Sequence, residues 1–341
     1  MSTPTVLKGS DAAVQNTNDD AQISKLSCVR LGYFKDDFIQ YFVRRASRRS
    51  PLINRGYYSR ITALRHLLYQ FLAAGHDPAT GSTPPKQVLS LGAGFDTTWF
   101  QLQSEGIAPA RYIEVDFAEV THKKANIIGS KEPLYKLLGL DKGGEIDAES
   151  GRIVTDQYCL LPADLRDLKA LEAALTSVGF QPELPTFILS ECVLVYMRSQ
   201  DSDALVHWLG RRLPTAVFVL YEQIKPDDAF GQQMLMNIES RGCPLLGIRG
   251  TPSLESHVAR FRNNGWQRAE AKDMNTIYRD HLDPQDKRRA ERLEIFDEFE
   301  EWHLIQEHYC IATAINDTQG IFRNYGLPEN ESIHKPLPCA D

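Results

Sequence analysis

Residues 87–98 read QVLSLGAGFDTT and join a mostly apolar strand candidate to a glycine turn. A second strand candidate, residues 111–117, reads RYIEVDF and ends beside Asp116. Gly92 and Gly94 let the backbone turn tightly and come close to a bound group. A carboxylate at the tip of the next strand can accept hydrogen bonds from both hydroxyls of a ribose. The two segments together predict a bound cofactor that contains adenosine.

The composition limits the class of protein. With 341 residues and 42% hydrophobic content, the chain can bury one large core. We expect one elaborated domain, although the length alone would permit two. The net charge of -7 argues against nucleic acid as the main partner, because phosphate binding needs clustered positive charge. The six cysteines are scattered without a CxxC pair or a histidine at zinc spacing, so we expect reduced thiols and no metal site.

The N-terminal residues carry no targeting pattern. Residues 1–22 are rich in Ser, Thr, Asn and Asp, and we expect a disordered tail without the apolar core of a signal peptide. No apolar run is long enough to cross a bilayer, so we expect no membrane partner. These features predict a cytoplasmic protein, which we expect to be a monomer.

The rest of the chain alternates between strand and helix patterns. A helical region from about Ser24 to Ala74 comes first, followed by a linker rich in Pro and Gly. Helical patterns then separate five strand candidates, at residues 87–91, 111–115, 158–162, 186–190 and 216–221. Such alternation predicts an α/β fold with a doubly wound, mostly parallel sheet, and cofactors bind at the carboxyl ends of its strands.

The last part of the chain departs from this alternation. Two late strand candidates, at residues 266–271 and 309–315, flank a charged helix candidate from Pro284 to about Glu307. They complete a predicted sheet of seven strands, whose last strand inserts antiparallel. We expect a single domain over residues 23–316, with a helical lid (23–75) and a substrate-side insert (about 227–256). The remaining residues, 317–341, are predicted to form a C-terminal tail.

The glycine turn also distinguishes between two adenosine cofactors. A nicotinamide-binding fingerprint places a third glycine where this chain has Thr97. Asp96 lies inside the turn, where its charge would repel a pyrophosphate but would tolerate the cationic amino acid end of S-adenosylmethionine. The local electrostatics therefore favour S-adenosylmethionine over NAD.

Three further segments extend the pattern. Residues 54–60 read NRGYYSR, residues 163–168 read ADLRDL and residues 190–197 read SECVLVYM. Together with LGAGFDTT and EVDF, in this order, they resemble the leucine carboxyl methyltransferases over roughly residues 31–315. Enzymes of that family methylate the C-terminal leucine of the catalytic subunit of protein phosphatase 2A. The resemblance implies a class I methyltransferase fold, S-adenosylmethionine as the cofactor and this phosphatase subunit as the partner.

The resemblance also implies roles for single residues. Arg60 matches the arginine that reaches the carboxylate of the cofactor and borders the substrate pocket, where it could orient the substrate carboxylate. Gly92 matches the glycine of the cofactor turn, and Asp116 matches the acid that binds the ribose. One departure is visible, because some members carry a lysine where this chain has Leu31. Two cations lie nearby in the sequence, Arg30 and Lys35.

The later motifs supply the remaining candidates. Asp164 and Leu165 match the pair that flanks the adenine, and Glu191 matches the acid near the methionine end. Tyr196 is a candidate wall of the pocket. Each assignment has a structural alternative: Asp116 and Asp164 could be helix N-caps, Arg60 could belong to an ordinary ion pair, and the tyrosine could be a core aromatic. Glu191 lies between apolar runs, where an unpaired charge is costly to bury, and so it needs a partner.

Methylation of a terminal carboxylate would also explain why no Ser/His/Asp set is found in the sequence. An α-carboxylate has a pKa of roughly 3.3 to 3.7, so it is already an ionised nucleophile at neutral pH. Two other readings stay open: a relative that acts on a small carboxylic acid or on a modified tRNA base, and a non-catalytic binding module. The tRNA-modifying relatives carry an added propeller domain, which we do not expect in this chain.

Overall fold

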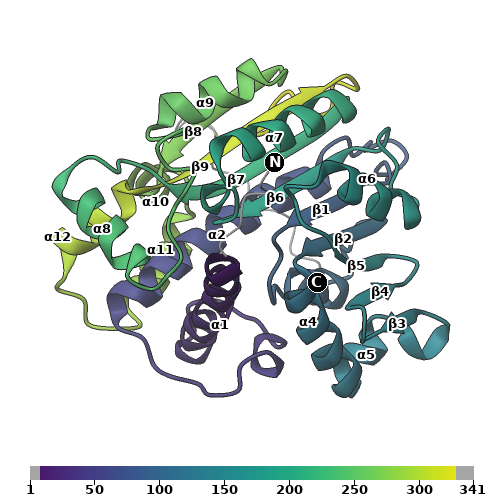
Figure 1. Ribbon diagram of the computed structural model, residues 1–341, viewed down its shortest axis with the longest axis horizontal. Helices are drawn as coiled ribbons and strands as arrows, with labels where there is room; N and C mark the ends of the chain where they lie inside the picture. Colours follow the sequence, from purple (N-terminus) through teal and green to yellow (C-terminus); the bar gives the residue numbers. More distant parts are fainter. Residues whose placement is uncertain (1–7, 328–341) are drawn as a thin grey trace, which may run out of the picture.

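The computed structural model describes residues 8–327, which form a single sheet with helices on both faces (Figure 1). The sheet has nine strands: β1 Gln87–Leu91, β2 Arg111–Asp116, β3 Glu145–Asp147, β4 Arg152–Val154, β5 Tyr158–Pro162, β6 Thr186–Glu191, β7 Thr215–Gln223, β8 Arg268–Asp273 and β9 Tyr309–Asp317. Their order in the sheet is β3-β4-β5-β2-β1-β6-β7-β9-β8.

The pairing confirms the predicted fold class. The five central strands β5, β2, β1, β6 and β7 are parallel. The last strand, β9, lies antiparallel between β7 and β8, as predicted. The sheet has nine strands rather than seven, because the hairpin of β3 and β4 adds to the free edge of β5. Its strands are three residues long, too short to show a strand period, and they bury Ile153.

The described residues contain twelve α-helices: α1 Lys8–Leu31, α2 Pro51–Ala73, α3 Thr98–Ser104, α4 Ala118–Ser130, α5 Glu132–Leu137, α6 Leu168–Ser177, α7 Ser199–Arg212, α8 Ala229–Glu239, α9 Leu254–Asn263, α10 Met274–Asp280, α11 Pro284–Glu291 and α12 Phe299–Glu307. The predicted charged helix after Pro284 is thus two helices, separated at residues 292–298. Within residues 8–327, every helix is too short or too polar to span a bilayer.

Successive side chains of the central strands point to opposite faces of the sheet and so belong to two separate cores, as the two-residue period of a strand requires. Leu89 and Leu91 of β1 face a core shared with α6, α7 and α9, whereas Val88 faces the opposite core, shared with α2, α3 and α4. Figure 1 shows α6, α7 and α9 along one side of the sheet and α4 on the other. The result is a fixed scaffold whose strand ends carry the predicted site.

The N-terminal prediction is wrong for residues 8–22, because α1 already begins at Lys8. Isolated polar segments rarely hold a helix, and here tertiary contacts stabilise it. Asp11 forms an ion pair with Arg166, and Asn18 Oδ1 accepts a hydrogen bond from the backbone N–H of Phe95 at 2.8 Å. Residues 1–7 of the predicted tail lie outside the described residues.

The C-terminal segment is loop after β9, as predicted, but residues 318–327 pack against the domain. The side chains of Phe322, Tyr325 and Leu327 are buried. The Phe322 ring stacks on that of Phe71 in α2, and the Tyr325 hydroxyl donates to the carbonyl of Leu67 at 2.9 Å. This part of the predicted tail therefore belongs to the folded domain, and residues 328–341 lie outside the described residues.

Candidate active site

A cavity of about 1020 Å³ lies at the carboxyl ends of β1, β2, β5 and β6. This is where a doubly wound sheet leaves a crevice between its strands and the following loops. Helices α1 and α2 line it from the N-terminal side, and residues 238–246 line it from the insert. The predicted site residues, far apart in the sequence, all line this cavity: Arg60, Gly92, Asp116, Asp164, Leu165, Glu191 and Tyr196.

One end of the cavity holds a cluster of buried charges. Arg60 Nε of α2 donates to Glu191 Oε1 at the end of β6. Lys25 Nζ of α1 lies 3.8 Å from Glu191 Oε2 and 3.6 Å from Asp96 Oδ1 in the glycine turn. The Arg60 guanidinium also stacks over the Tyr221 ring, 4.4 Å from its centroid. Two cations and two carboxylates from four separate segments therefore meet in one place.

Neighbouring charges favour the ionised forms of Arg60, Lys25 and Asp96. Burial alone would lower the pKa of Arg60 and of Lys25, but the neighbouring acidic groups, with Glu191 the strongest, together outweigh it and both pKa values are raised. Burial would raise the pKa of Asp96, but the nearby positive charges of Lys25 and Lys124 lower it. The cavity therefore presents fixed positive and negative groups side by side, a pattern that fits a zwitterionic ligand.

The other end of the cavity holds Asp116. Its Oδ2 accepts a hydrogen bond from the Gly94 N–H at 2.6 Å, and its Oδ1 accepts one from the Phe117 N–H at 2.7 Å. A carboxylate has about four lone-pair positions, so each oxygen can still accept a ligand hydroxyl. The N-cap alternative is wrong, because α4 starts at Ala118 with Phe117 as its N-cap residue. Burial raises the pKa of Asp116 to about 6.

Asp164 lies beside this end of the cavity. Its carboxylate binds Arg166, with Nη2 at 2.6 Å from Oδ2, and the same guanidinium contacts Asp11 of α1. Here too the N-cap alternative is wrong, because Asp167 caps α6 by accepting from the N–H groups of Lys169 and Ala170. Arg166 thus ties the predicted adenine-flanking loop to α1.

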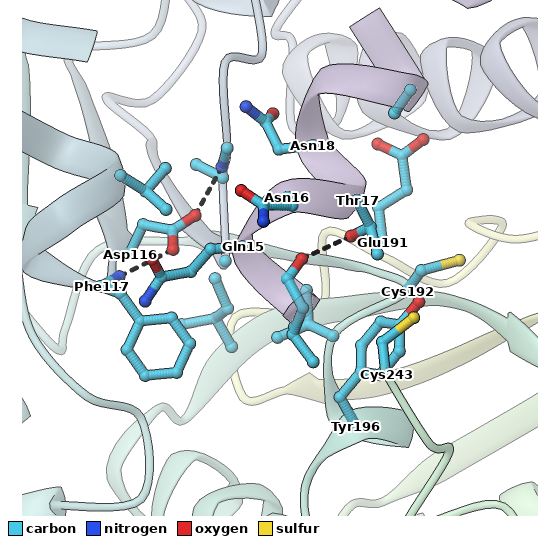
Figure 2. A pocket seen from close by; sticks show the side chains of 18 of the residues that line it. Gln15, Asn16, Thr17, Asn18, Asp116, Phe117, Glu191, Cys192, Tyr196 and Cys243 are labelled. Carbon is cyan, nitrogen blue, oxygen red and sulfur yellow. Dashed lines mark hydrogen bonds between the residues drawn. The ribbon is translucent and has the colours of Figure 1, made fainter. Parts of the chain in front are cut away.

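Sequence reasoning missed the contribution of α1. Figure 2 shows Gln15 and Asn16 near the middle of the cavity, with Asp116 on one side and Glu191 and Cys192 on the other. These residues come from a segment predicted to be disordered. The only signal for a helix there was its continuation into the periodic pattern from Ser24 onward.

The cation that the N-terminal segment supplies is Lys25. Neither of the two cations considered from the sequence lines the cavity: Arg30 is exposed, and Lys35 is exposed and pairs with Asp37. Lys25 is instead buried and directed at Glu191. Lys25 lies about two turns before the end of α1, and its contact with Glu191 depends on how this helix packs against the domain.

Comparison with known proteins decides the family. The profile of the family described as leucine carboxyl methyltransferase matches residues 13–210. The chain belongs to the leucine carboxyl methyltransferase family. This protein is therefore a methyltransferase that uses S-adenosylmethionine.

Relatives of this methyltransferase differ in their described substrates. The leucine carboxyl methyltransferase 1 homolog of Arabidopsis thaliana is 53% identical over 316 residues, 93% of each chain. The leucine carboxyl methyltransferase 1 of Rattus norvegicus is 36% identical, over 91% of each chain. The human tRNA wybutosine-synthesizing protein 4 is 43% identical over 96% of this chain, but only 47% of that protein is covered.

The fold also agrees with a solved structure. The crystal structure described as a putative methyltransferase from Thermobifida fusca matches with a TM-score of 0.51 at 12% sequence identity, over 92% of this chain and 97% of that one. At this identity the likeness supports the class I methyltransferase architecture alone.

The residues of the cavity fit the cofactor of the family. S-adenosylmethionine carries ribose hydroxyls, an α-ammonium, an α-carboxylate and a sulfonium. Asp116 offers acceptors for the hydroxyls, Glu191 offers a partner for the ammonium, and Arg60 and Lys25 offer partners for the carboxylate. The cavity thus has a group of the right charge for each polar part of the cofactor.

Replacing Lys25 by methionine is expected to weaken the binding of S-adenosylmethionine about tenfold, because one charge-assisted contact is lost while Arg60 remains. Isothermal titration calorimetry of the purified variant measures the change. Lys35→Met is the matched control, since that lysine is exposed and forms an ion pair with Asp37. Equal affinities for wild type and the Lys25 variant would show that the cavity lysine does not contact the cofactor.

Proposed function

We propose that this protein methyl-esterifies the α-carboxylate of the C-terminal leucine of the protein phosphatase 2A catalytic subunit. The observation that carries the proposal is a single cavity with two kinds of surface. Charged groups that fit the cofactor line one part, and apolar side chains line the part next to it. The 53% identity to a leucine carboxyl methyltransferase 1 homolog, over 93% of both chains, supports a leucine carboxylate as the acceptor.

The apolar part of the cavity has the character required for a leucine side chain. It is bounded by Val193 and Tyr196 after β6 and by Cys243 and Leu246 of the insert. Figure 2 shows Tyr196 and Cys243 next to each other, below Glu191 and Cys192 and across the cavity from Asp116. A terminal leucine placed there would bring its carboxylate toward the charged cluster.

The acceptor needs no general base in this proposal. A chain-terminal carboxylate is ionised well below neutral pH, with a pKa of roughly 3.3 to 3.7. When bound, S-adenosylmethionine supplies an activated methyl group on its sulfonium. The role of the protein is then to place the reacting groups. Holding the reacting atoms in line can lower the activation barrier by on the order of 7 to 11 kcal/mol.

Arg60 is the residue we propose for orienting the acceptor carboxylate. Its guanidinium is shared between Glu191 and the face of Tyr221, so its charge is partly satisfied before any substrate arrives. A partly satisfied cation can guide a carboxylate without holding it so tightly that the ground state is favoured. Since the reaction neutralises two opposite charges, exclusion of water by α1 and the insert also favours it.

A carboxylate on a modified tRNA base is the second candidate acceptor. It is favoured by the 43% identity to human tRNA wybutosine-synthesizing protein 4. One observation weighs against it: the net charge of this chain is -7. An RNA substrate would require clustered positive charge.

The decisive experiment uses methyl-labelled cofactor with purified phosphatase, either intact or lacking its last leucine. We expect the label to enter the intact phosphatase and to be released by mild alkali, as an ester should be. Removal of the leucine is expected to lower incorporation to background. Label that persists without the leucine, or that enters bulk tRNA instead, would refute the substrate assignment.

We also propose that residues 23–75 act as a lid and residues 227–256 as a substrate-side insert, because both segments line the cavity. Slower amide exchange in α1 and α8 when cofactor and peptide bind would support these roles. We further propose that the protein is a monomer, which sedimentation would test. We also propose that it is located in the cytoplasm with its acceptor, which cell fractionation would test.

A further inference from the structure

The turn after β6 joins the two parts of the cavity. It carries Cys192, Val193 and Tyr196, which all line the cavity. Cys192 has a φ of 56°, in a region that costs energy for a residue other than glycine. Val193 packs on the cofactor turn so closely that a Cβ on Gly92 would lie 2.6 Å from its Cγ2. A small displacement of this turn would therefore disturb both the cofactor site and the acceptor wall.

Glu222 of β7 holds this turn from the side of the sheet. Its side chain is fully buried, and its Oε1 accepts a hydrogen bond from the Val195 N–H at 2.7 Å. The Leu194 N–H also interacts with the carboxylate. On the other side, the Gly247 N–H of the insert donates to the Val195 carbonyl at 2.8 Å. The Val195 residue is thus fixed by the sheet and by the insert at once.

The region behind Glu222 contains buried polar atoms that lack hydrogen-bond partners among residues 8–327. Glu222 Oε2, Arg260 Nη2 and both ring nitrogens of His257 are buried without a hydrogen-bond partner among the described residues. Buried polar groups are normally satisfied, and a buried charge is costly. The cost of burying the Glu222 carboxylate here suggests that it has a functional role.

We propose that the carboxylate of Glu222 is a positioning residue for methyl transfer. By holding the backbone of residues 194–195, it fixes the turn that places Val193 against the cofactor turn and Tyr196 against the acceptor. The inference rests on the proposed function only for the choice of acceptor in the activity assay.

The protonation state of Glu222 gives this role a measurable pH dependence. Burial raises the pKa of Glu222 to about 7, although the charge of Arg260 and the backbone N–H groups lower it. Above that pH the carboxylate is ionised, and it accepts charge-assisted hydrogen bonds from the backbone N–H groups. As the pH falls through about 7 the group takes up a proton, and its hold on the turn weakens.

Other ionisable groups face Glu222 from each element packed against it. They are Arg260 and His257 of α9, Asp203 of α7 through Arg260, Cys310 of β9 and Cys192 of the turn itself. Burial lowers the pKa of His257 to about 3 and raises that of both thiols, so these three groups stay neutral between pH 6 and 8. Among them, Glu222 is the group expected to titrate in this range.

The test compares Glu222→Gln with wild type at saturating cofactor and phosphatase. We expect kcat at pH 8 to fall about tenfold, since a charge-assisted hydrogen bond is replaced by a neutral one. The Kd of S-adenosylmethionine is expected to change less than about threefold, because the cofactor's charged partners are untouched. Glu270→Gln is the matched control: its carboxylate accepts the Leu327 N–H at 3.1 Å, and it does not line the cavity.

Two pH titrations separate positioning from general stability. The kcat of wild type should decline below pH 7, and that of Glu222→Gln should be flat between pH 6 and 8. The amide protons of residues 194 and 195, followed by NMR, should lose protection over the same pH range in wild type. This second readout needs neither an acceptor nor a variant.

The outcomes are distinct. A Glu222→Gln variant with wild-type kcat and pH profile, or amide protection in wild type that is independent of pH, would overturn the inference. If wild type binds cofactor but leaves the phosphatase unlabelled, the proposed acceptor is wrong, and the amide protection still decides the role of Glu222.

Discussion

Replacement of Arg60 by methionine is expected to lower kcat/KM by roughly a hundredfold, because a hydrogen bond between the guanidinium and a ligand carboxylate is worth about 1.5 to 3 kcal/mol. Arg60 is mostly buried, donates to Glu191 and stacks on Tyr221. Its loss leaves Lys25 as the one cation still paired with Glu191 among the described residues. Steady-state methylation of the phosphatase measures the effect.

Arg60→Lys distinguishes orientation from simple binding. Lysine keeps the charge but loses the planar guanidinium that stacks on Tyr221. If Arg60 orients the acceptor, kcat should fall; a change confined to KM would mean that the arginine only binds and that the orienting role is wrong. Arg65→Met is the matched control, because Arg65 is on the same helix, pairs with Glu105 and lies outside the cavity.

Replacement of Asp116 by asparagine is expected to weaken cofactor binding roughly a hundredfold, since charge-assisted hydrogen bonds to two hydroxyls are each worth about 1.5 to 3 kcal/mol. Asparagine has one acceptor oxygen, and the Gly94 and Phe117 N–H groups already compete for it. Calorimetric titration with S-adenosylmethionine measures the loss. Asp37→Asn, at an exposed ion pair with Lys35, should leave the affinity unchanged.

The same residue gives cofactor binding a pH dependence. The pKa of Asp116 is raised to about 6 by burial, and the ionised form is the one that accepts ribose hydroxyls. Affinity should therefore be constant above that pH and decline as the pH falls through about 6. The Asn variant should lack this decline. An identical pH profile in the two proteins would contradict the ribose-binding role.

The parts of the fold and site that the sequence predicts are those encoded locally. The five parallel strands are mostly apolar, and their limits match the predicted ones within two residues. Gly92, Asp116, Asp164 and Glu191 directly end or follow these strands, so the topology alone brings them to one edge of the sheet. Their arrangement needed no knowledge of long-range contacts.

The parts that it does not predict depend on contacts between distant segments. The first half of α1 is polar and forms a helix where Asn18 meets the Phe95 N–H and Asp11 meets Arg166. Lys25 reaches the cavity only because this helix is docked. Glu222 lies in an otherwise apolar strand, and its partner backbone, at residues 194–195, belongs to another element.

One helix touches both ends of the cavity: Asp11 of α1 meets the loop beside Asp164, and Lys25 meets Glu191. Spent donor cannot leave through the space that this helix occupies unless the helix swings aside. In the lid role proposed for this segment, departure of the spent donor by this route would make the undocking rate of α1 an upper limit on the number of catalytic cycles per second. Stronger contacts at Asp11 and Lys25 would then bind the cofactor more tightly and slow turnover.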